Sequence, residues 1–205
     1  MSDGKPTYLV FDTETTGLFD FKLPADAPGQ PRLASVAFIV ADELGREISR
    51  NKHYIKPDEW EMSPETGAIN GLTTEFLAEN GVPVSAVLDE YVDHVAFGLI
   101  VAAFNVQFDA KMMRAELRRA SRDDRFETTP NTCIMRSLKP YGAEGLVIKN
   151  GQYVKLEAAC AHFGILNADA HDAMADAEAA RAILEILIRD GRLIPPAVHY
   201  AKAKT

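Results

Sequence analysis

The sequence "YLVFDTETTGL" at residues 8–18 constrains the chain more than any other stretch, because an apolar strand runs directly into acidic residues. Residues two apart in a strand face the same side with Cα atoms about 7 Å apart, so Asp12 and Glu14 aim at one point. Two unpaired carboxylates there would repel, and one would hold a proton. A divalent cation removes the conflict, and Mg²⁺ and Mn²⁺ prefer carboxylate and water oxygens. The stretch therefore predicts a metal site; the alternative is a surface turn with solvated acids.

Composition and charge exclude several classes of protein. The chain has 205 residues, of which 47% are hydrophobic and 25% charged, as is typical of one globular domain over residues 1–205. The net charge of −8 argues against coating nucleic acid by bulk electrostatics, but not against an enzyme that binds a few phosphates locally. No apolar run is long enough to span a membrane, and the N-terminus lacks the order of a signal peptide. We therefore expect a cytoplasmic protein without a membrane partner, with buried free thiols at Cys133 and Cys160.

The succession of strand and helix patterns predicts one mixed α/β sheet with helices on its faces. Strands at 8–11, 32–42 and 48–57 are expected to form an antiparallel unit. Residues 19–31 hold three prolines and a glycine and are expected to form a surface loop beside the acidic site. The first half of the tail at 192–205 is expected to pack and its last residues to fray. A buried strand is expected at 99–105, and helices at 63–71, 73–81, 84–96, 106–120, 156–165 and 170–190.

Two motifs resemble those of the DEDD superfamily of 3′–5′ exonucleases, whose fold is ribonuclease-H-like. The first is "FDTETTGL", which contains Asp12 and Glu14, and the second is "FNVQFDAKMM". The second matches an Asn-x-x-Phe-Asp pattern at Asn105, Phe108 and Asp109. A strand ends there and a helix begins, with Asn105 as a natural N-cap and Asp109 in the first turn, near the positive end of the helix dipole. By itself, Asp109 at this place could equally be a residue that stabilises the helix end.

The third motif, "HDAMADAEAA", matches a His-x₄-Asp spacing at His171 and Asp176 and is identified with the DEDDh branch of the superfamily. Five residues along a helix turn by about 500°, so both side chains cannot share one helical face. His171 is therefore expected in the preceding loop or the first turn. Asp172 does share a face with Asp176, but the spacing of the family selects Asp176 and leaves Asp172 at the helix start. The resemblance covers about residues 7–188, with Phe104 where relatives often have His.

The resemblance implies two-metal phosphodiester hydrolysis with two Mg²⁺ or Mn²⁺ ions per site. By similarity, Asp12, Glu14 and Asp176 would bind the first metal. Asp12 would bridge to the second metal, to which Asp109 would contribute directly or through water. His171 would take the proton from the attacking water, because an imidazole titrates near neutrality.

Contacts with the terminal nucleotide are implied for Thr15, Gly17 and Leu18 after the first motif, where Gly17 would permit a close turn. Leu18 would be either a wedge beside the last base or an ordinary core residue. In the second motif, Asn105 and Phe108 are candidate substrate contacts, and Phe108 may simply fill the core. A basic run favours a solvated helix face over a strip that guides the phosphate backbone. It consists of Lys111, Arg114, Arg118, Arg119, Arg122 and Arg125.

The sequence thus predicts a metal-dependent 3′–5′ exonuclease that releases nucleoside monophosphates from single-stranded or frayed DNA ends. An exoribonuclease that trims RNA remains open, because the motifs fix the scissile bond and not the sugar. A non-catalytic nucleic-acid-binding module is disfavoured, because all four carboxylates and the histidine are present. The expected partner is a nucleic acid 3′ end, either for a stand-alone nuclease or for a subunit that meets a polymerase in trans.

Overall fold

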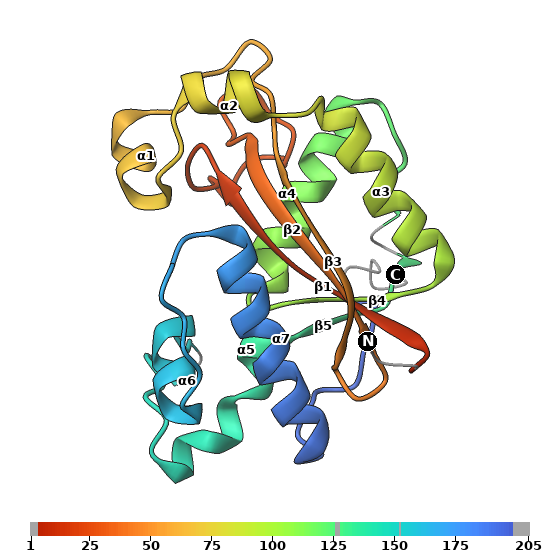
Figure 1. Ribbon diagram of the computed structural model, residues 1–205, viewed down its shortest axis with the longest axis vertical. Helices are drawn as coiled ribbons and strands as arrows, with labels where there is room; N and C mark the ends of the chain where they lie inside the picture. Colours follow the sequence, from red (N-terminus) through yellow and green to blue (C-terminus); the bar gives the residue numbers. More distant parts are fainter. Residues whose placement is uncertain (1–3, 126–127, 152, 199–205) are drawn as a thin grey trace.

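A five-stranded sheet with the order β3-β2-β1-β4-β5 forms the centre of the molecule (Figure 1). The computed structural model describes residues 4–125, 128–151 and 153–198. The strands are β1 (Pro6–Thr15), β2 (Leu33–Asp42), β3 (Glu47–Tyr54), β4 (Ile100–Ala103) and β5 (Asn131–Cys133). The helices are α1 (Pro64–Asn70), α2 (Thr74–Asn80), α3 (Val84–Phe97), α4 (Val106–Arg119), α5 (Ile134–Ser137), η2 (Lys139–Glu144), α6 (Leu156–Phe163) and α7 (Ala173–Arg189).

The pairing of the strands confirms the predicted mixed sheet. β1 pairs antiparallel with β2, and β2 pairs antiparallel with β3. On its other edge β1 pairs parallel with β4, which pairs parallel with β5. All ten residues of β2 are buried, as expected for an apolar strand inside a sheet that is covered by helices. Three antiparallel strands are thus followed by parallel ones, with β1 at the junction.

Helices on both sides of the sheet give the alternating side chains of β1 different surroundings. Phe11 pairs in register with Phe38 of β2, and both rings contact Tyr91 of α3. α7 packs across β1 and β2 on the opposite side from α3 and α4 (Figure 1). Because successive side chains of a strand alternate, Asp12 and Glu14 lie on the side away from Phe11. The carboxyl-terminal half of β1 therefore presents two acids toward α7.

Residues 121–155, for which no element was predicted, contain β5, α5 and η2. β5 is only three residues long, which is too short to show a strand period. It is a parallel edge strand that continues directly into α5. The side-chain hydroxyl of Ser137 in α5 accepts a hydrogen bond from the backbone N–H of Ile194 and so ties this region to the tail.

The first part of the tail packs, as predicted. The backbones of Asn131 and Ala197 exchange two hydrogen bonds, and Leu193 contacts the core. The last residues of the tail were predicted to fray, but residues 199–205 lie outside the part of the chain that the structure describes. Both cysteines are free and buried, as predicted. Among the described residues, no helix combines the length and the apolar character needed to cross a bilayer.

The predicted loop at 19–31 lies on the surface but is anchored at both ends. Phe19 is buried and packs edge-on against Phe108 of α4. The buried side chain of Gln30 accepts a hydrogen bond from the backbone N–H of Asp20 and donates to the carbonyls of Asp20 and Pro24. These contacts hold the loop in a defined conformation against α4.

Candidate active site

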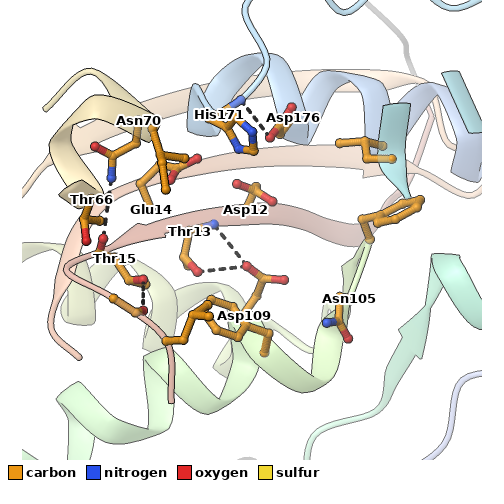
Figure 2. A pocket seen from close by; sticks show the side chains of 16 residues that line it. Asp12, Thr13, Glu14, Thr15, Thr66, Asn70, Asn105, Asp109, His171 and Asp176 are labelled. Atoms are coloured by element: carbon orange, nitrogen blue, oxygen red, sulfur yellow. Dashed lines mark hydrogen bonds between the residues drawn. The ribbon is translucent and has the colours of Figure 1, made fainter. Parts of the chain in front are cut away.

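One cavity of about 420 Å³ lies where the end of β1, the start of α4 and the start of α7 meet. Figure 2 shows side chains from all three elements directed into it. All ten residues that the sequence singled out as candidate site residues line this cavity. They are Asp12, Glu14, Thr15, Gly17, Leu18, Asn105, Phe108, Asp109, His171 and Asp176.

Strand alternation and one threonine set the positions of three of the acids. Asp12 and Glu14 point to the same side of β1, while Thr13 between them points toward α4 (Figure 2). The backbone N–H of Thr13 donates to Oδ1 of Asp109 at 3.1 Å, and its hydroxyl donates to the same oxygen at 2.8 Å. Thr13 thus fixes the carboxylate of α4 against the strand that carries the other two.

The helix start at α4 differs from the prediction in one detail. Asn105 occupies the N-cap position of α4, but its side chain makes no capping hydrogen bond there. The predicted N-cap position of Asn105 is therefore right, but the expected hydrogen bond between its side chain and the start of the helix is not formed. The side chain instead lines the cavity, and the backbone carbonyl of Asn105 accepts from Phe108 and Asp109. Asp109 lies in the first turn, as predicted, and is buried.

The start of α7 explains how a histidine and an aspartate five residues apart face one cavity. Asp172 is the N-cap and accepts hydrogen bonds from the backbone N–H groups of Met174 and Ala175. His171 precedes the helix with φ of 68°, a left-handed conformation that turns the chain back over the first helical turn. Its backbone N–H donates to Oδ2 of Asp176 at 3.2 Å. His171 before the helix, Asp172 at its start and Asp176 within it therefore all lie where the sequence predicted them.

The closest set of possible metal ligands comprises Glu14, His171 and Asp176. Their ligand atoms all lie within 4.8 Å of one another. The family resemblance had assigned Asp12 with Glu14 and Asp176 to the first metal and had given His171 the role of base. In the structure the imidazole of His171 lies close to the carboxylates of Glu14 and Asp176. Asp12 and Asp109 line the same cavity.

Burial, with the charges of neighbouring carboxylates, raises the pKa values of Asp12, Glu14 and Asp109. Burial raises the pKa of Asp12 well above its ordinary value, and the charges of Asp109 and Asp176 add to the shift. Burial, followed by the charge of Asp176, raises the pKa of Glu14 to about 8. Burial also raises the pKa of Asp109 to about 7, although the hydrogen bonds from Thr13 oppose the shift.

A divalent cation fits this donor set. Among the described residues, no Lys, Arg or His forms an ion pair with Asp12, Glu14, Asp109 or Asp176. Carboxylate oxygens are the ligands that hard divalent cations prefer, and a bound cation would favour the ionised carboxylates that burial disfavours. The residues present therefore fit a divalent metal ion.

Comparison with known proteins identifies the family. The family model described as "RNase_T: Exonuclease" matches residues 9–184, which is most of the chain. The chain belongs to this exonuclease family. The match confirms the predicted resemblance to the DEDDh 3′–5′ exonucleases, whose ordered motifs are all present. No curated protein sequence matches the chain significantly.

Solved structures of exonuclease I confirm the ribonuclease-H-like fold. E. coli exonuclease I in complex with a dT13 oligonucleotide has 24% identity and a TM-score of 0.73, over 89% of this chain and 41% of that chain. A zinc-bound E. coli exonuclease I–ssDNA complex has 24% identity and a TM-score of 0.72, over 91% and 41%. Exonuclease I from Methylocaldum szegediense has 25% identity and a TM-score of 0.72, over 87% and 39%. The chain thus spans about two fifths of the length of these proteins.

Three further residues of this exonuclease-family site were missed by the sequence analysis as functional residues. Thr13 holds Asp109, as described above. Asn70, at the end of α1, donates from Nδ2 to the backbone carbonyl of Thr15 at 3.5 Å, and its amide lowers the pKa of Glu14 against the other causes. Asn167 donates from Nδ2 to Oδ1 of Asp176 at 2.7 Å. Thr13 lies inside the first motif and could have been found there, but no sequence signal points to the two asparagines.

The apolar side of the cavity decides between the two readings of Leu18. Its side chain is 85% exposed, so it is not a core residue. Ile69 of α1 also lines the cavity and is 61% exposed. Phe108 is partly buried and packs against the Phe19 ring, so it fills space beneath the cavity as well as lining it. Gly17 does not have the left-handed backbone of a glycine-requiring turn, and a Cβ there would meet no atom within 4 Å.

The basic run of α4 and the turn after it is largely neutralised by ion pairs, which favours a structural role. Arg118 pairs with Asp26 and Asp124, and Arg114 pairs with Asp124. Arg119 pairs with Glu116 of the same helix. Two further pairs join Arg122 to Asp89 and Arg125 to Asp123, and the ammonium group of Lys111 lies over the rings of Phe19 and Phe21.

Proposed function

We propose that this chain is a metal-dependent 3′–5′ exonuclease that releases nucleoside monophosphates from single-stranded or frayed DNA ends. The observation that carries the proposal is the convergence of Asp12, Glu14, Asp109 and Asp176, with His171, on one cavity where burial and like charge favour a bound cation. DNA is favoured over RNA because the E. coli exonuclease I structures that resemble the chain hold deoxyoligonucleotides. Family membership supports the class of reaction.

The carboxylates would hold two Mg²⁺ or Mn²⁺ ions. We assign Asp12, Glu14 and Asp176 to one ion, and Asp12 with Asp109 to the other. Such ions supply Lewis-acid stabilisation of the phosphodiester and ionise a bound water. The protein positions its ligands beforehand, because Thr13 orients Asp109 and the N–H of His171 and the amide of Asn167 orient Asp176.

His171 is assigned to proton transfer. Its left-handed backbone places the imidazole beside Glu14 and Asp176 at the exposed side of the cavity. From there the ring can accept the proton of the attacking water and pass it to solvent. A His171→Ala variant should keep divalent-metal binding in large part and lose most of the rate of hydrolysis, whereas loss of a carboxylate should remove both.

Thr15, Gly17 and Leu18 are assigned to the terminal nucleotide, together with Asn105 and Phe108. The hydroxyl of Thr15 donates to the carbonyl of Gly17 at 2.6 Å, which holds the turn that presents Leu18. An exposed leucine and an exposed isoleucine in the lining of one cavity offer apolar surface against which a base can lie without any reading of its hydrogen-bonding edge. The terminal base is therefore expected to matter little for the rate.

The test is a time course on a 5′-labelled single-stranded DNA with Mg²⁺ or Mn²⁺. A ladder that shortens from the 3′ end, with mononucleotide products, is expected, and EDTA or Asp12→Asn should abolish it. Asp93→Asn, which changes an exposed acid on α3, serves as the matched control and should retain full activity. A matched RNA strand tests the exoribonuclease alternative. A folded protein that binds the strand but never shortens it would contradict the proposal and favour a binding module.

A link to DNA replication or repair through a polymerase in trans belongs to the same proposal. A chain with a net charge of −8 binds few phosphates by bulk charge, so assembly with a polymerase would help to supply the DNA end. Pull-down of a replicative polymerase with the chain tests this point independently of the nuclease assay.

A further inference from the structure

A second cavity, of about 660 Å³, adjoins the candidate active site. It lies between α6, the loop at 164–171 and the end of β4. The two cavities share Phe104, Asn105, Leu156, His171 and Asp176 among their lining residues. They are therefore not independent pockets but two spaces on either side of one group of catalytic candidates.

The walls of the second cavity are mainly apolar. Met135 and Val154 are buried in its lining, and Ile165 is partly buried. Leu166 is 90% exposed and also lines the cavity, so a large apolar side chain stays in solvent at its edge. The volume lies within the range of about 300–1,000 Å³ that is typical of pockets for small organic ligands. A cavity of this kind suits a base or sugar that is held by contact rather than by base-edge hydrogen bonds.

One polar atom in this region has no partner among the described residues. The amide of Asn167, which lines the cavity, donates to Asp176 through Nδ2, but its buried Oδ1 accepts no hydrogen bond. A buried acceptor without a donor costs free energy. A donor on a bound ligand would satisfy it next to the reaction centre.

A nucleic acid strand has to pass on both sides of the phosphate that is cleaved. In the proposed function, the terminal nucleotide lies in the first cavity, beside Leu18, and the phosphate lies at the carboxylates. The preceding nucleotide then needs an adjoining space, and the second cavity begins at His171 and Asp176. We propose that the second cavity binds the nucleotide on the 5′ side of the scissile phosphate, with Leu166 against its base or sugar. This inference rests on the proposed function.

Equilibrium binding separates the two cavities. Thymidine 5′-monophosphate can fill only the first, whereas the dinucleotide pTpT can reach both; binding is measured with Ca²⁺ in place of Mg²⁺ to limit turnover. Wild type should bind pTpT more tightly than the monophosphate. Leu166→Ser should weaken pTpT binding about fivefold or more, since one base contact is worth at least that much, and should leave monophosphate binding unchanged. Leu166→Phe, which keeps an apolar surface, should retain tight binding.

The matched control is Leu44→Ser, which changes a half-exposed leucine in the turn between β2 and β3. It should alter neither binding constant. Wild type that shortens DNA but binds both ligands equally, or Leu166→Ser that weakens both ligands equally or neither, would overturn the second subsite. Wild type that neither shortens DNA nor binds the monophosphate would instead refute the proposed function on which the subsite rests.

Discussion

Helix α4 carries two buried acids, and the molecule treats them in opposite ways. Glu116 is 2% exposed, and Arg32 and Arg119 both pair with it at 2.9 Å. Its Oε1 also accepts the backbone N–H of Leu33. Asp109, two helical turns earlier and 4% exposed, receives hydrogen bonds from Thr13 but has other carboxylates as its charged neighbours. One acid is neutralised by the protein, and the other is not.

The difference shows which acids are structural. Burying an ionised carboxylate without a partner is costly, so a fold that needs only stability supplies a cation, as it does at Glu116. The described residues supply no ion-paired cation at Asp12, Glu14, Asp109 or Asp176, and the pKa values of Asp12, Glu14 and Asp109 rise instead, chiefly through burial. Burial and like charge thus favour the protonated carboxyls of Asp12, Glu14 and Asp109, and a divalent ion would favour their ionised forms. Within one helix, Glu116 therefore has the surroundings of a buried ion pair, and Asp109 has those expected of a metal ligand.

Removing one acid from each region should change stability in opposite directions. Asp12→Asn relieves like-charge repulsion and should leave metal-free protein at least as stable as wild type. Its hydrolysis rate should fall about a thousandfold or more, since metals provide several kcal/mol of transition-state stabilisation. Glu116→Gln leaves two arginines without their partner and should cost about 2 kcal/mol of unfolding free energy, with little loss of rate per folded molecule. Urea unfolding in EDTA and a DNA-shortening assay measure both effects.

The comparison fails if the two substitutions act alike. If Asp12→Asn destabilised the metal-free protein as much as Glu116→Gln does, the acids of the cavity would have a structural role. The proposal that they bind metal ions would then lose its support. Retained hydrolysis in folded Asp12→Asn would contradict the proposed mechanism directly.

The stability of metal-free protein should fall as pH rises. In the folded state Glu14 has a pKa of about 8 and Asp109 of about 7, while carboxyls in an unfolded chain titrate near 4. Between these values the folded state holds more protons, so unfolding becomes easier with each increase in pH. Melting in EDTA should therefore occur at lower temperature at about pH 8.5 than at about pH 5.5. Added Mn²⁺ should reverse the trend, because it binds the ionised carboxylates.

Asp12→Asn provides the control for this dependence on pH. It removes one charge from the cluster and should reduce the loss of stability toward high pH, while Glu116→Gln should shift the whole curve without changing that slope. A metal-free wild type whose melting temperature is the same across this range of pH would show that the carboxyls of the cavity do not interact as described.

The sequence predicted those parts of the site that a local pattern encodes. Alternation in β1 placed Asp12 and Glu14 on one side, and the helix start after a buried strand placed Asp109 in a first turn. The five-residue spacing already excluded a shared helical face for His171 and Asp176, and the left-handed backbone of His171 is the structural answer.

The parts that the sequence did not predict depend on contacts between distant segments. Asn70 meets Glu14 because α1 packs near the end of β1, and nothing within α1 signals that contact. The sequence could not distinguish an exposed Leu18 from a buried one, because an apolar residue directly after a strand is common in both situations. The strand β5 is too short for any period, and it is defined by its pairing with β4 and by the bridge from Asn131 to Ala197.

A smaller effect is expected from the residue that orients Asp176. Asn167→Ala removes the 2.7 Å hydrogen bond from Nδ2 to the carboxylate but no proposed metal ligand. Loss of such an orienting partner typically lowers metal affinity about tenfold or more. Mn²⁺ titration followed by electron paramagnetic resonance measures this directly, without turnover. Asn80→Ala, which removes an asparagine whose Nδ2 bonds a carbonyl of its own helix α2, is the matched control and should leave the affinity unchanged. Equal affinities in both variants would show that Asn167 does not orient Asp176.

The smallest effect should come from Thr13, which holds the acid of α4 that the comparison began with. Thr13→Val keeps the backbone hydrogen bond to Asp109 and removes only the hydroxyl bond at 2.8 Å. The pKa of Asp109 should rise further, and the Mg²⁺ concentration for half-maximal hydrolysis should increase about threefold to tenfold, which corresponds to the net value of one typical intramolecular hydrogen bond. Thr13→Ser removes the methyl group and keeps the hydroxyl, so its metal requirement should match that of wild type. If Thr13→Ser raised the requirement as much as Thr13→Val, packing of the methyl group and not the hydroxyl would position Asp109.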